Sequence, residues 1–296
     1  VLAGDKFLQE KKIVKIITPA AGSASMTQWV NPPVDDLYMF RFAAADNIQS
    51  AMVVEEAILL KFNKVAVLHD ATNYGVSGRD DLTRRITADG KLAIVATEKF
   101  NIGDKDMSAQ LLRAKASGAQ AVLIWGIGPE LAAVANDMAK IGFKVPLIGG
   151  WTLSMSNFIN NAGANGDGAL MPQTFIEEPV TKAAASFIEA YHKAYAVARI
   201  PSPVSAAQGY DAVLLLAAAV KQAGSTDPQK IRDALEDLRE PVNGVIATWK
   251  KPYSKWDAAH PETHEAFRRE NVVMGMVNGG RVVFANPDDR ARLEKR

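Results

Sequence analysis

The sequence contains no cysteine, which excludes disulfide bonds, thiolate metal sites and cysteine nucleophiles. A surplus of charge is also missing, because 34 basic and 33 acidic residues give the 296-residue chain a net charge of +1. This balance gives no electrostatic reason to expect a nucleic acid or a membrane surface as partner. No apolar run approaches the ~20 residues that a membrane-spanning helix needs, and no basic-then-apolar signal segment opens the chain. We therefore expect no transmembrane segment.

The signatures of common catalytic and cofactor sites are missing as well, including GxxxxGK[ST], GxSxG and HExxH. Gly126-Ile127-Gly128 follows a predicted strand, but the third glycine of a dinucleotide loop is absent, so a tight turn is the favoured interpretation. His260 and His264 have the spacing of two metal ligands on a helix, although their polar, proline-containing surroundings favour a solvated surface. We assign no catalytic residue, metal site or cofactor, and we do not expect an enzyme.

What the sequence does contain is a strand–loop–helix rhythm. Short β-branched runs alternate with amphipathic segments that end at glycine, and Asp46 is placed to cap the first long helix. Such alternation predicts an α/β fold with mostly parallel sheets and helices on both faces. The predicted strands are 12–18, 65–69, 91–97, 120–125 and 145–148, and the predicted helices are 46–62, 76–90, 106–117 and 129–142.

The pattern changes after about Gln173. Helices are predicted at 181–199, 205–223 and 227–238, followed by strands at 245–249, 272–277 and 282–284. The last two strands flank Asn278-Gly279-Gly280, a good hairpin turn. No Gly/Ser-rich or Pro-rich linker separates two halves, so we expect a chain that crosses several times between two lobes.

Four loops follow the carboxyl ends of the predicted strands, where open α/β sheets bind ligands: 20–25, 70–75, 126–129 and 149–154. The first contains small residues that free backbone N–H groups, and it precedes a helix, as a carboxylate seat would. Tyr74 and Trp151 add flat amphipathic surfaces. The alternatives are that 20–25 is only a tight connection and that the two aromatic residues only pack their loops.

At these loops the sequence resembles the leucine/isoleucine/valine-type (branched-chain amino-acid) periplasmic receptors of ABC transporters, in the type I binding-protein superfamily. The matching stretches are ITPAAGSA (17–24), VAVLHDATNYG (65–75), GDKDMSAQLLRAKASGAQAVLIWG (103–126), VPLIGG (145–150) and GYDAVLLLAAAVKQAG (209–224). The resemblance implies two Rossmann-like lobes joined by three crossovers that close on a ligand. One lobe would comprise 1–45 with 175–255 and the other 46–174 with 270–296, while 256–269 would form a surface excursion.

The resemblance also implies a set of ligand-binding residues in the cleft between the lobes. The seat for a ligand carboxylate would be the backbone and hydroxyl groups of one loop, and the facing lobe would present aromatic and small residues. Two further positions would form pocket walls. The residues are Ala20, Ala21, Gly22 and Ser23 in the seat, Asn73, Tyr74, Gly150 and Trp151 opposite, and Ile127 and Ser205 in the walls.

Two departures from the family pattern matter. Family members begin with two further βα units, so at ~30 residues per unit the resemblance implies about 60–70 further residues before Val1. An unpaired sheet edge and exposed apolar surface are then expected. In addition, Trp151 stands where amino-acid receptors of this family place an acidic side chain for the ligand ammonium. A buried ammonium without a counter-charge is costly, whereas an indole favours a flat apolar ligand.

The sequence thus predicts the extracytoplasmic receptor of an ABC importer that binds a small carboxylated ligand, with an aromatic acid favoured. The alternatives are a receptor for branched-chain or other amino acids and a ligand-sensing regulator on the same fold. The expected partners are the ligand and a membrane permease, and the protein itself is expected to be a monomer. We expect it in the periplasm, or tethered outside a Gram-positive membrane, with its signal peptide removed.

Overall fold

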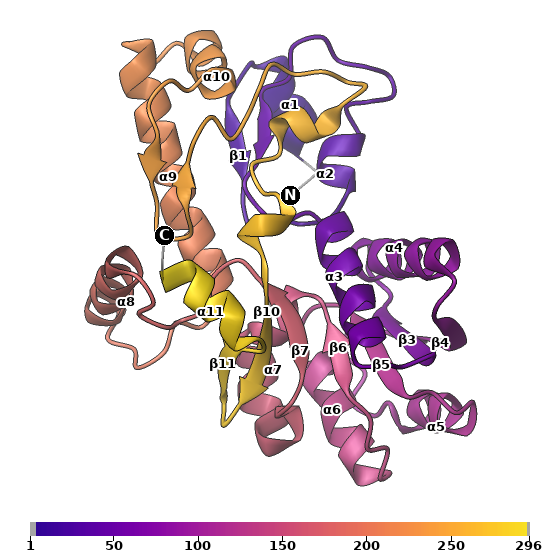
Figure 1. The fold of residues 1–296 in the computed structure, drawn as a ribbon. Helices are drawn as coiled ribbons and strands as arrows, with labels where there is room; N and C mark the ends of the chain where they lie inside the picture. The colour runs from indigo at the N-terminus through magenta and orange to yellow at the C-terminus, as the bar shows by residue number, and fades with distance from the viewer. Residues whose placement is uncertain (1–3, 295–296) are drawn as a thin grey trace.

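The computed structural model describes residues 4–294, and Figure 1 shows them as two lobes. The second lobe contains a seven-stranded sheet in the order β11-β10-β7-β6-β5-β3-β4. The strands from β3 to β7 run parallel, whereas β10 lies antiparallel to both β7 and β11. Their bounds are β3 Lys64–Asp70, β4 Ala93–Phe100, β5 Ala121–Trp125, β6 Leu147–Gly149, β7 Leu170–Gln173, β10 Val273–Asn278 and β11 Arg281–Phe284.

Alternate residues of the central strands explain why helices cover both faces of this sheet. Val65 and Val67 of β3 pack in one core cluster with α3 and α4, while Ala66 and Leu68 pack in another with α5, α6 and α7. A strand that is apolar on both faces must be covered on both, as a parallel sheet requires. The helices are α3 Asp46–Leu59, α4 Asn73–Asp89, α5 Ser108–Ala116, α6 Glu130–Lys140 and α7 Ser156–Ala162, with short turns η2 Trp151–Ser154 and η3 Gly163–Gly166.

The first lobe holds β1 and β2, which pair in parallel, and the small antiparallel pair β8 and β9. Among the described residues β1 pairs with β2 alone, and Tyr210 and Val213 of α9 are exposed, so the open edge and apolar surface expected from the sequence are both present. The bounds are α1 Asp5–Glu10, β1 Lys15–Ile17, α2 Ala24–Thr27, β2 Met39–Arg41, α8 Lys182–Tyr195, α9 Pro203–Ala223, α10 Pro228–Glu236, β8 Val242–Asn243 and β9 Thr248–Trp249; η4 Pro261–His264, η5 Arg269–Asn271 and α11 Pro287–Glu294 complete the chain.

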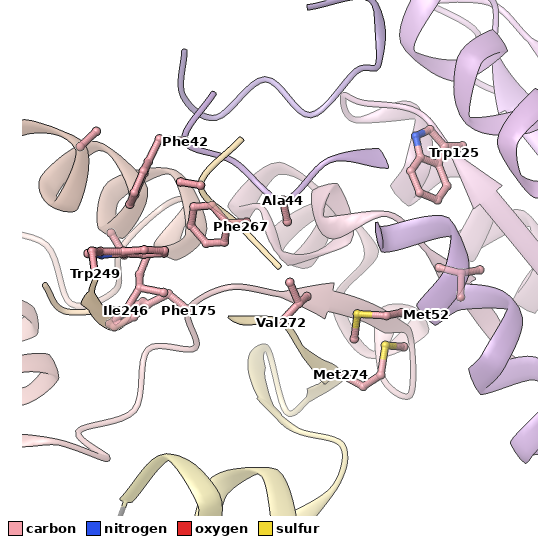
Figure 2. Packing of buried hydrophobic residues seen from close by; sticks show 14 of the residues in the cluster. Phe42, Ala44, Met52, Trp125, Phe175, Ile246, Trp249, Phe267, Val272 and Met274 are labelled. Carbon is pink, nitrogen blue, oxygen red and sulfur yellow. The ribbon is translucent and has the colours of Figure 1, made fainter. Parts of the chain in front are cut away.

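Three segments connect the lobes, at 42–45, 174–181 and 266–272, and side chains from all three enter one core cluster. Phe42 from the first packs edge-on against Trp249 and Phe267, with ring centroids 4.7 and 4.9 Å apart. Figure 2 shows this aromatic group together with Phe175 from the second crossover and Val272 from the third. The hinge is therefore a packed apolar structure, which limits the lobes to a small set of relative positions.

Several sequence-based element boundaries need correction. Ala45, not Asp46, caps α3, and the Asp46 side chain makes no capping hydrogen bond. Helix α4 begins at Asn73, because the Thr72 hydroxyl accepts from the Gly75 N–H and starts the helix inside the predicted loop. The predicted hairpin turn is confirmed, since Gly279 and Gly280 both have positive φ.

The predicted surface excursion at 256–269 is less solvated than expected. Trp256, His264 and Phe267 are all buried within it. His264 bonds the Met39 carbonyl through Nδ1 and the Glu236 carboxylate through Nε2, at 2.8 and 3.0 Å. The segment therefore covers one side of the first lobe, because its aromatic side chains, although spaced among polar residues, pack in the hydrophobic core clusters.

Helix α9 is the one described helix long and apolar enough to cross a membrane by length and composition. It has 21 residues, and its most apolar window of 18 residues has a mean hydropathy of 1.3. In the structure 44% of that window is buried, and α9 packs against α10. A core helix of a soluble protein passes the same test, so these properties are weak support for a membrane span.

Candidate functional site

In the loop after β1, residues 20–23, the backbone N–H groups are left without hydrogen-bond partners among the described residues, whereas two of the carbonyl groups are bonded to a buried side chain. Arg41 Nη1 donates to the carbonyl oxygens of Ala21 and Gly22 at 3.0 and 2.8 Å, and its other amino group pairs with Glu265. No hydrogen bond from the backbone N–H groups of 20–23 reaches another described residue. With the carbonyls held by a buried cation, the remaining N–H donors can bind an anion.

Ser23 lies at the contact between the two lobes. Its hydroxyl is 3.3 Å from the hydroxyl of Ser77 on α4, so the loop after β1 touches the facing lobe. The helix after this loop, α2, has only four residues, and its dipole is too short to support an anion as the sequence suggested. A carboxylate seat at this place would depend on backbone N–H groups and the Ser23 hydroxyl.

Asp70, the last residue of β3, ties two of the facing loops together. Its carboxylate accepts from the Thr72 N–H and hydroxyl and, at 2.9 Å, from the Ile127 N–H. This bond fixes the backbone of Ile127, whose side chain is 39% exposed. Asn73 is exposed at the start of α4. Neither Asn73 nor Ile127 lines the cavity between the lobes, so their predicted contact with a ligand requires a different lobe position.

Tyr74 and Gly150 meet on the inner side of these loops. A Cβ atom on Gly150 would lie 3.1 Å from the Tyr74 hydroxyl, so a larger residue would push against it. The Tyr74 hydroxyl is buried, and burial raises its pKa well above the usual value. Thr152 and Trp125 lie beside it, yet no described group forms a well-aligned hydrogen bond to it. Tyr74 does not line the cavity between the lobes, so its predicted contact with a ligand also requires a different lobe position.

Trp151 is 8% exposed and occupies the cleft between the lobes. Its backbone N–H donates to the side chain of Gln49 on α3 at 3.0 Å, and the Gln49 amide in turn donates to the Ala44 carbonyl at 2.9 Å. Gln49 therefore links the first crossover to the loop that presents the indole. Such a second contact holds an aromatic side chain in a defined position.

A cavity of about 10 Å³ lies between the lobes, with room for one water molecule at most. Trp151 is the one residue of the predicted site that lines it. Ser205 does not, since its hydroxyl bonds Ser202 at 2.7 Å, and its neighbour Val204 takes the position instead. The lining residues are Pro19, Ala44, Gln49, Trp151, Pro172, Thr174, Val204, Gln208 and Val272. The lobes are thus closed together, and an organic ligand needs them to open.

The sequence interpretation missed a polar group at the hinge side of this cavity. Gln208 on α9 donates to the Thr174 hydroxyl at 3.0 Å and accepts from the Thr18 hydroxyl at 3.3 Å. Thr174 directly follows β7, so the rule about strand ends could have found it. Gln208 lies one helical turn after Val204 and shares its face, a spacing that becomes informative only when that face is known to line the cleft.

Asp46 is the other functional candidate that the sequence interpretation placed elsewhere. It is fully buried beside the seat, and its backbone N–H donates to the Ala21 carbonyl at 3.0 Å. Burial raises the pKa of Asp46 to about 7, an effect that Arg41 reduces and Asp81 increases. Neither side-chain oxygen has a hydrogen-bond partner among the described residues.

The two histidines with metal-ligand spacing do not form a site together. His260 is exposed and bonds Asp257, whereas His264 is buried with different partners. Within residues 4–294 no three His, Asp or Glu side chains converge as metal ligands would.

Two α/β lobes, three crossovers and strand-end loops that converge between the lobes define a hinged receptor of the type I periplasmic binding fold. The profile of the family described as "Periplasmic binding protein" matches residues 1–267. The chain belongs to this family.

Two relatives show how far the similarity extends. A leucine-, isoleucine-, valine-, threonine-, and alanine-binding protein of Pseudomonas aeruginosa is 27% identical over 270 residues, covering 90% of this chain and 69% of that protein. A Leu/Ile/Val-binding protein homolog of Brucella melitensis is 28% identical, covering 79% of this chain and 61% of that protein. The chain therefore matches roughly two thirds of the length of these relatives.

Solved structures repeat the fold. A type 1 periplasmic binding protein from Bordetella pertussis Tohama I superposes with a TM-score of 0.78 at 26% identity, covering 96% of this chain and 77% of that one. At 20% identity or below, a Rhodopseudomonas palustris solute-binding protein in complex with benzoate (TM-score 0.76; 96% and 73% covered) and a Thermus thermophilus branched chain amino acid transporter structure with bound valine (0.75; 96% and 74%) share the fold alone.

Proposed function

We propose that this chain is the ligand-binding receptor of an ABC importer and that it holds a carboxylated aromatic compound between its lobes. Binding involves no chemical change, and the closed form delivers the ligand to a membrane permease. The receptor works outside the cytoplasmic membrane, in the periplasm or tethered to a Gram-positive surface, and acts as a monomer. The lobe boundaries given above belong to the same proposal.

The observation that carries the ligand class is Trp151 in the cleft, on a cavity whose lining includes no acidic side chain. An ammonium group brought into this cavity would lose its hydration without an acidic side chain in the lining to contact it. An aromatic ring would stack on the indole, and its carboxylate would reach the free N–H groups of 20–23 and the Ser23 hydroxyl. Tyr74 would then contact the ligand from the facing lobe.

The mechanism is a shift of population between open and closed lobes. A ligand that bridges the loop after β1 and the Trp151 loop gains contacts in the closed form alone, and this difference drives closure. Ser23 and Ser77 meet across the lobes in this structure, and the cavity there has room for one water molecule at most, so the ligand-bound form must hold the lobes further apart than they are here.

The second candidate is a receptor for branched-chain amino acids, which the names of the two relatives support. Calorimetry with benzoate, 3,4-dihydroxybenzoate, leucine and valine separates the two. Tight binding of an aromatic acid with inert leucine and valine supports the first proposal, and the reverse result replaces it with the second. Native mass spectrometry of the purified protein adds an unbiased search for a retained ligand.

A further inference from the structure

One buried carboxyl group lies behind the proposed carboxylate seat without a part in the ligand contacts described above. Asp46 is fully buried at the first turn of α3, directly after the first crossover. Neither of its oxygens accepts a hydrogen bond from the residues that the structure describes. An ionised carboxylate without donors is costly to bury, so this place favours the protonated, neutral form.

A single hydrogen bond connects Asp46 to the seat. Its backbone N–H donates to the Ala21 carbonyl, and the Ala21 carbonyl also accepts from Arg41. Asp46 directly follows the first crossover, so this hydrogen bond joins the end of the crossover to the seat. A movement of the lobes and a change in the charge of Asp46 would therefore both affect the seat. A second negative charge in the seat would repel an ionised Asp46 through an interior of low effective dielectric.

The charged groups that face Asp46 come from two neighbouring elements. Arg41 on β2 favours the ionised form, while Asp81 on α4 opposes it. Tyr74, also on α4, is held neutral by burial. Arg85 of α4 donates to the first turns of α3, which fixes the two helices together next to this carboxyl. Burial is the largest influence and brings the pKa of Asp46 to about 7, within the range where a modest change in field alters its charge.

We propose that the receptor takes up a proton at Asp46 when it binds a carboxylate ligand, so that the ligand-bound form holds a neutral Asp46 behind the seat. This inference rests on the proposed function. The neutral carboxyl removes the repulsion between the ligand carboxylate and Asp46, while Arg41 stays paired with Glu265. A carboxylate ligand then binds more tightly as the pH falls. A ligand that presents an ammonium group would show the opposite dependence.

The test measures the dissociation constant of benzoate by calorimetry from pH 5.5 to 8.5, a range over which benzoate itself stays ionised. Wild-type affinity is expected to fall about threefold to tenfold between pH 6.5 and 8.5, in keeping with transfer of up to one proton. Repeating the titration in buffers of different ionisation enthalpy counts the protons taken up. Asp46→Asn is expected to give a flat profile with no proton uptake.

Two further variants identify the group that titrates. Asp81→Asn removes the negative charge that faces Asp46, so the midpoint of the profile should move to lower pH while the dependence remains. Glu56→Gln is the matched control, since Glu56 lies on the same helix and burial raises its pKa too. It should keep the wild-type profile.

The outcomes separate this inference from the function on which it rests. Benzoate binding that is independent of pH, or a pH dependence that survives in Asp46→Asn, overturns proton uptake and leaves the carboxylate receptor in place. Failure of benzoate and 3,4-dihydroxybenzoate to bind at every pH overturns the ligand class and the inference with it. Affinity for leucine or valine that rises with pH does the same.

Discussion

Gln49 accepts a hydrogen bond from the backbone N–H of Trp151 at 3.0 Å, across 102 residues of sequence. The bond joins the helix after the first crossover to the loop that presents the indole in the cleft. Because the Gln49 amide also holds the Ala44 carbonyl in that crossover, one side chain coordinates the hinge with the ligand-facing aromatic residue. Position of the lobes and position of the indole are therefore coupled.

Replacing Trp151 tests the stacking surface. Trp151→Ala should weaken aromatic-acid binding by about 1–3 kcal/mol, because an aromatic contact in a desolvated cleft is lost. Trp151→Phe should recover part of this loss, since a smaller ring still stacks. Calorimetry with benzoate measures both variants, and a dissociation constant unchanged in Trp151→Ala would remove the indole from the site.

Replacing Gln49 tests its positioning role. Gln49→Leu leaves the buried Trp151 N–H without an acceptor, which should cost about 1–3 kcal/mol in the free energy of unfolding. Ligand affinity should fall as well, because the indole loses its support. In the double variant with Trp151→Ala the two losses of affinity should not add, because Gln49 no longer has an indole to position. Simple additivity in calorimetry would show that Gln49 acts independently of the indole.

Replacing Arg41 tests the seat. Arg41→Lys keeps the charge but cannot donate to the carbonyls of Ala21 and Gly22 while pairing Glu265. Since Arg41 is 2% exposed, breaking this network should reduce the free energy of unfolding by about 3–5 kcal/mol. Urea unfolding measures the loss. Glu265→Gln, which keeps a hydrogen-bond acceptor, should cost less, and an equal cost would show that charge pairing alone matters.

The pH dependence of stability follows from Asp46 in the protein without ligand. Asp46 loses its proton near pH 4 in the unfolded chain and at about 7 in the folded one, so between these values the unfolded chain binds fewer protons and stability falls as the pH rises. Asp46→Asn removes this loss. Relative to wild type, the variant should gain on the order of 2–4 kcal/mol between pH 4 and pH 8. Urea unfolding of both proteins at pH 4 and pH 8 measures this. The same difference in the free energy of unfolding between Asp46→Asn and wild type at both pH values would contradict the assignment.

A pair of glycine variants tests the packing of α4 on the sheet. A Cβ atom on Gly78 would lie 2.1 Å from the Trp125 ring, whereas a Cβ atom on Gly209 of α9 meets nothing within 4 Å. Gly78→Ala should therefore destabilise the protein by about 1–3 kcal/mol through overpacking. Gly209→Ala should stabilise it by about 0.5–1 kcal/mol, as expected in a helix. Thermal unfolding measures both variants. A melting temperature of Gly78→Ala that is no lower than that of Gly209→Ala would argue against the close approach of Gly78 to Trp125.

Much of the architecture could be predicted locally. β-Branched runs marked β1, β3, β4, β5 and β6, whereas β2 and β7 were not predicted, because neither contains a β-branched residue. Glycines such as Gly90 and Gly142 marked helix ends, where the structure gives both a positive φ. Asp227 was expected at a helix start, and its side chain indeed accepts from the Lys230 N–H. These features depend on neighbours within a few residues, which the sequence displays directly.

The candidate site could be predicted less well. The loops were found because strand ends of a parallel sheet share one edge, but Asn73 and Ile127 proved exposed and Ser205 turned to another serine. Gln49 and Gln208 stand inside helices, where a single polar residue gives no sign of which face it occupies. Their partners lie far away along the chain.

The sequence by itself determined the α/β class, the alternation of strands and helices from β3 to β6, the lack of thiol chemistry and the presence of Trp151 where an acid was expected. Only the tertiary structure decided that Arg41 holds the carbonyls of the seat, that His264 is buried, and that Asp46 stands in a dry place without a donor. Propensity and turn chemistry act over a few residues, whereas desolvation and hydrogen-bond supply depend on segments that meet only when the chain has folded.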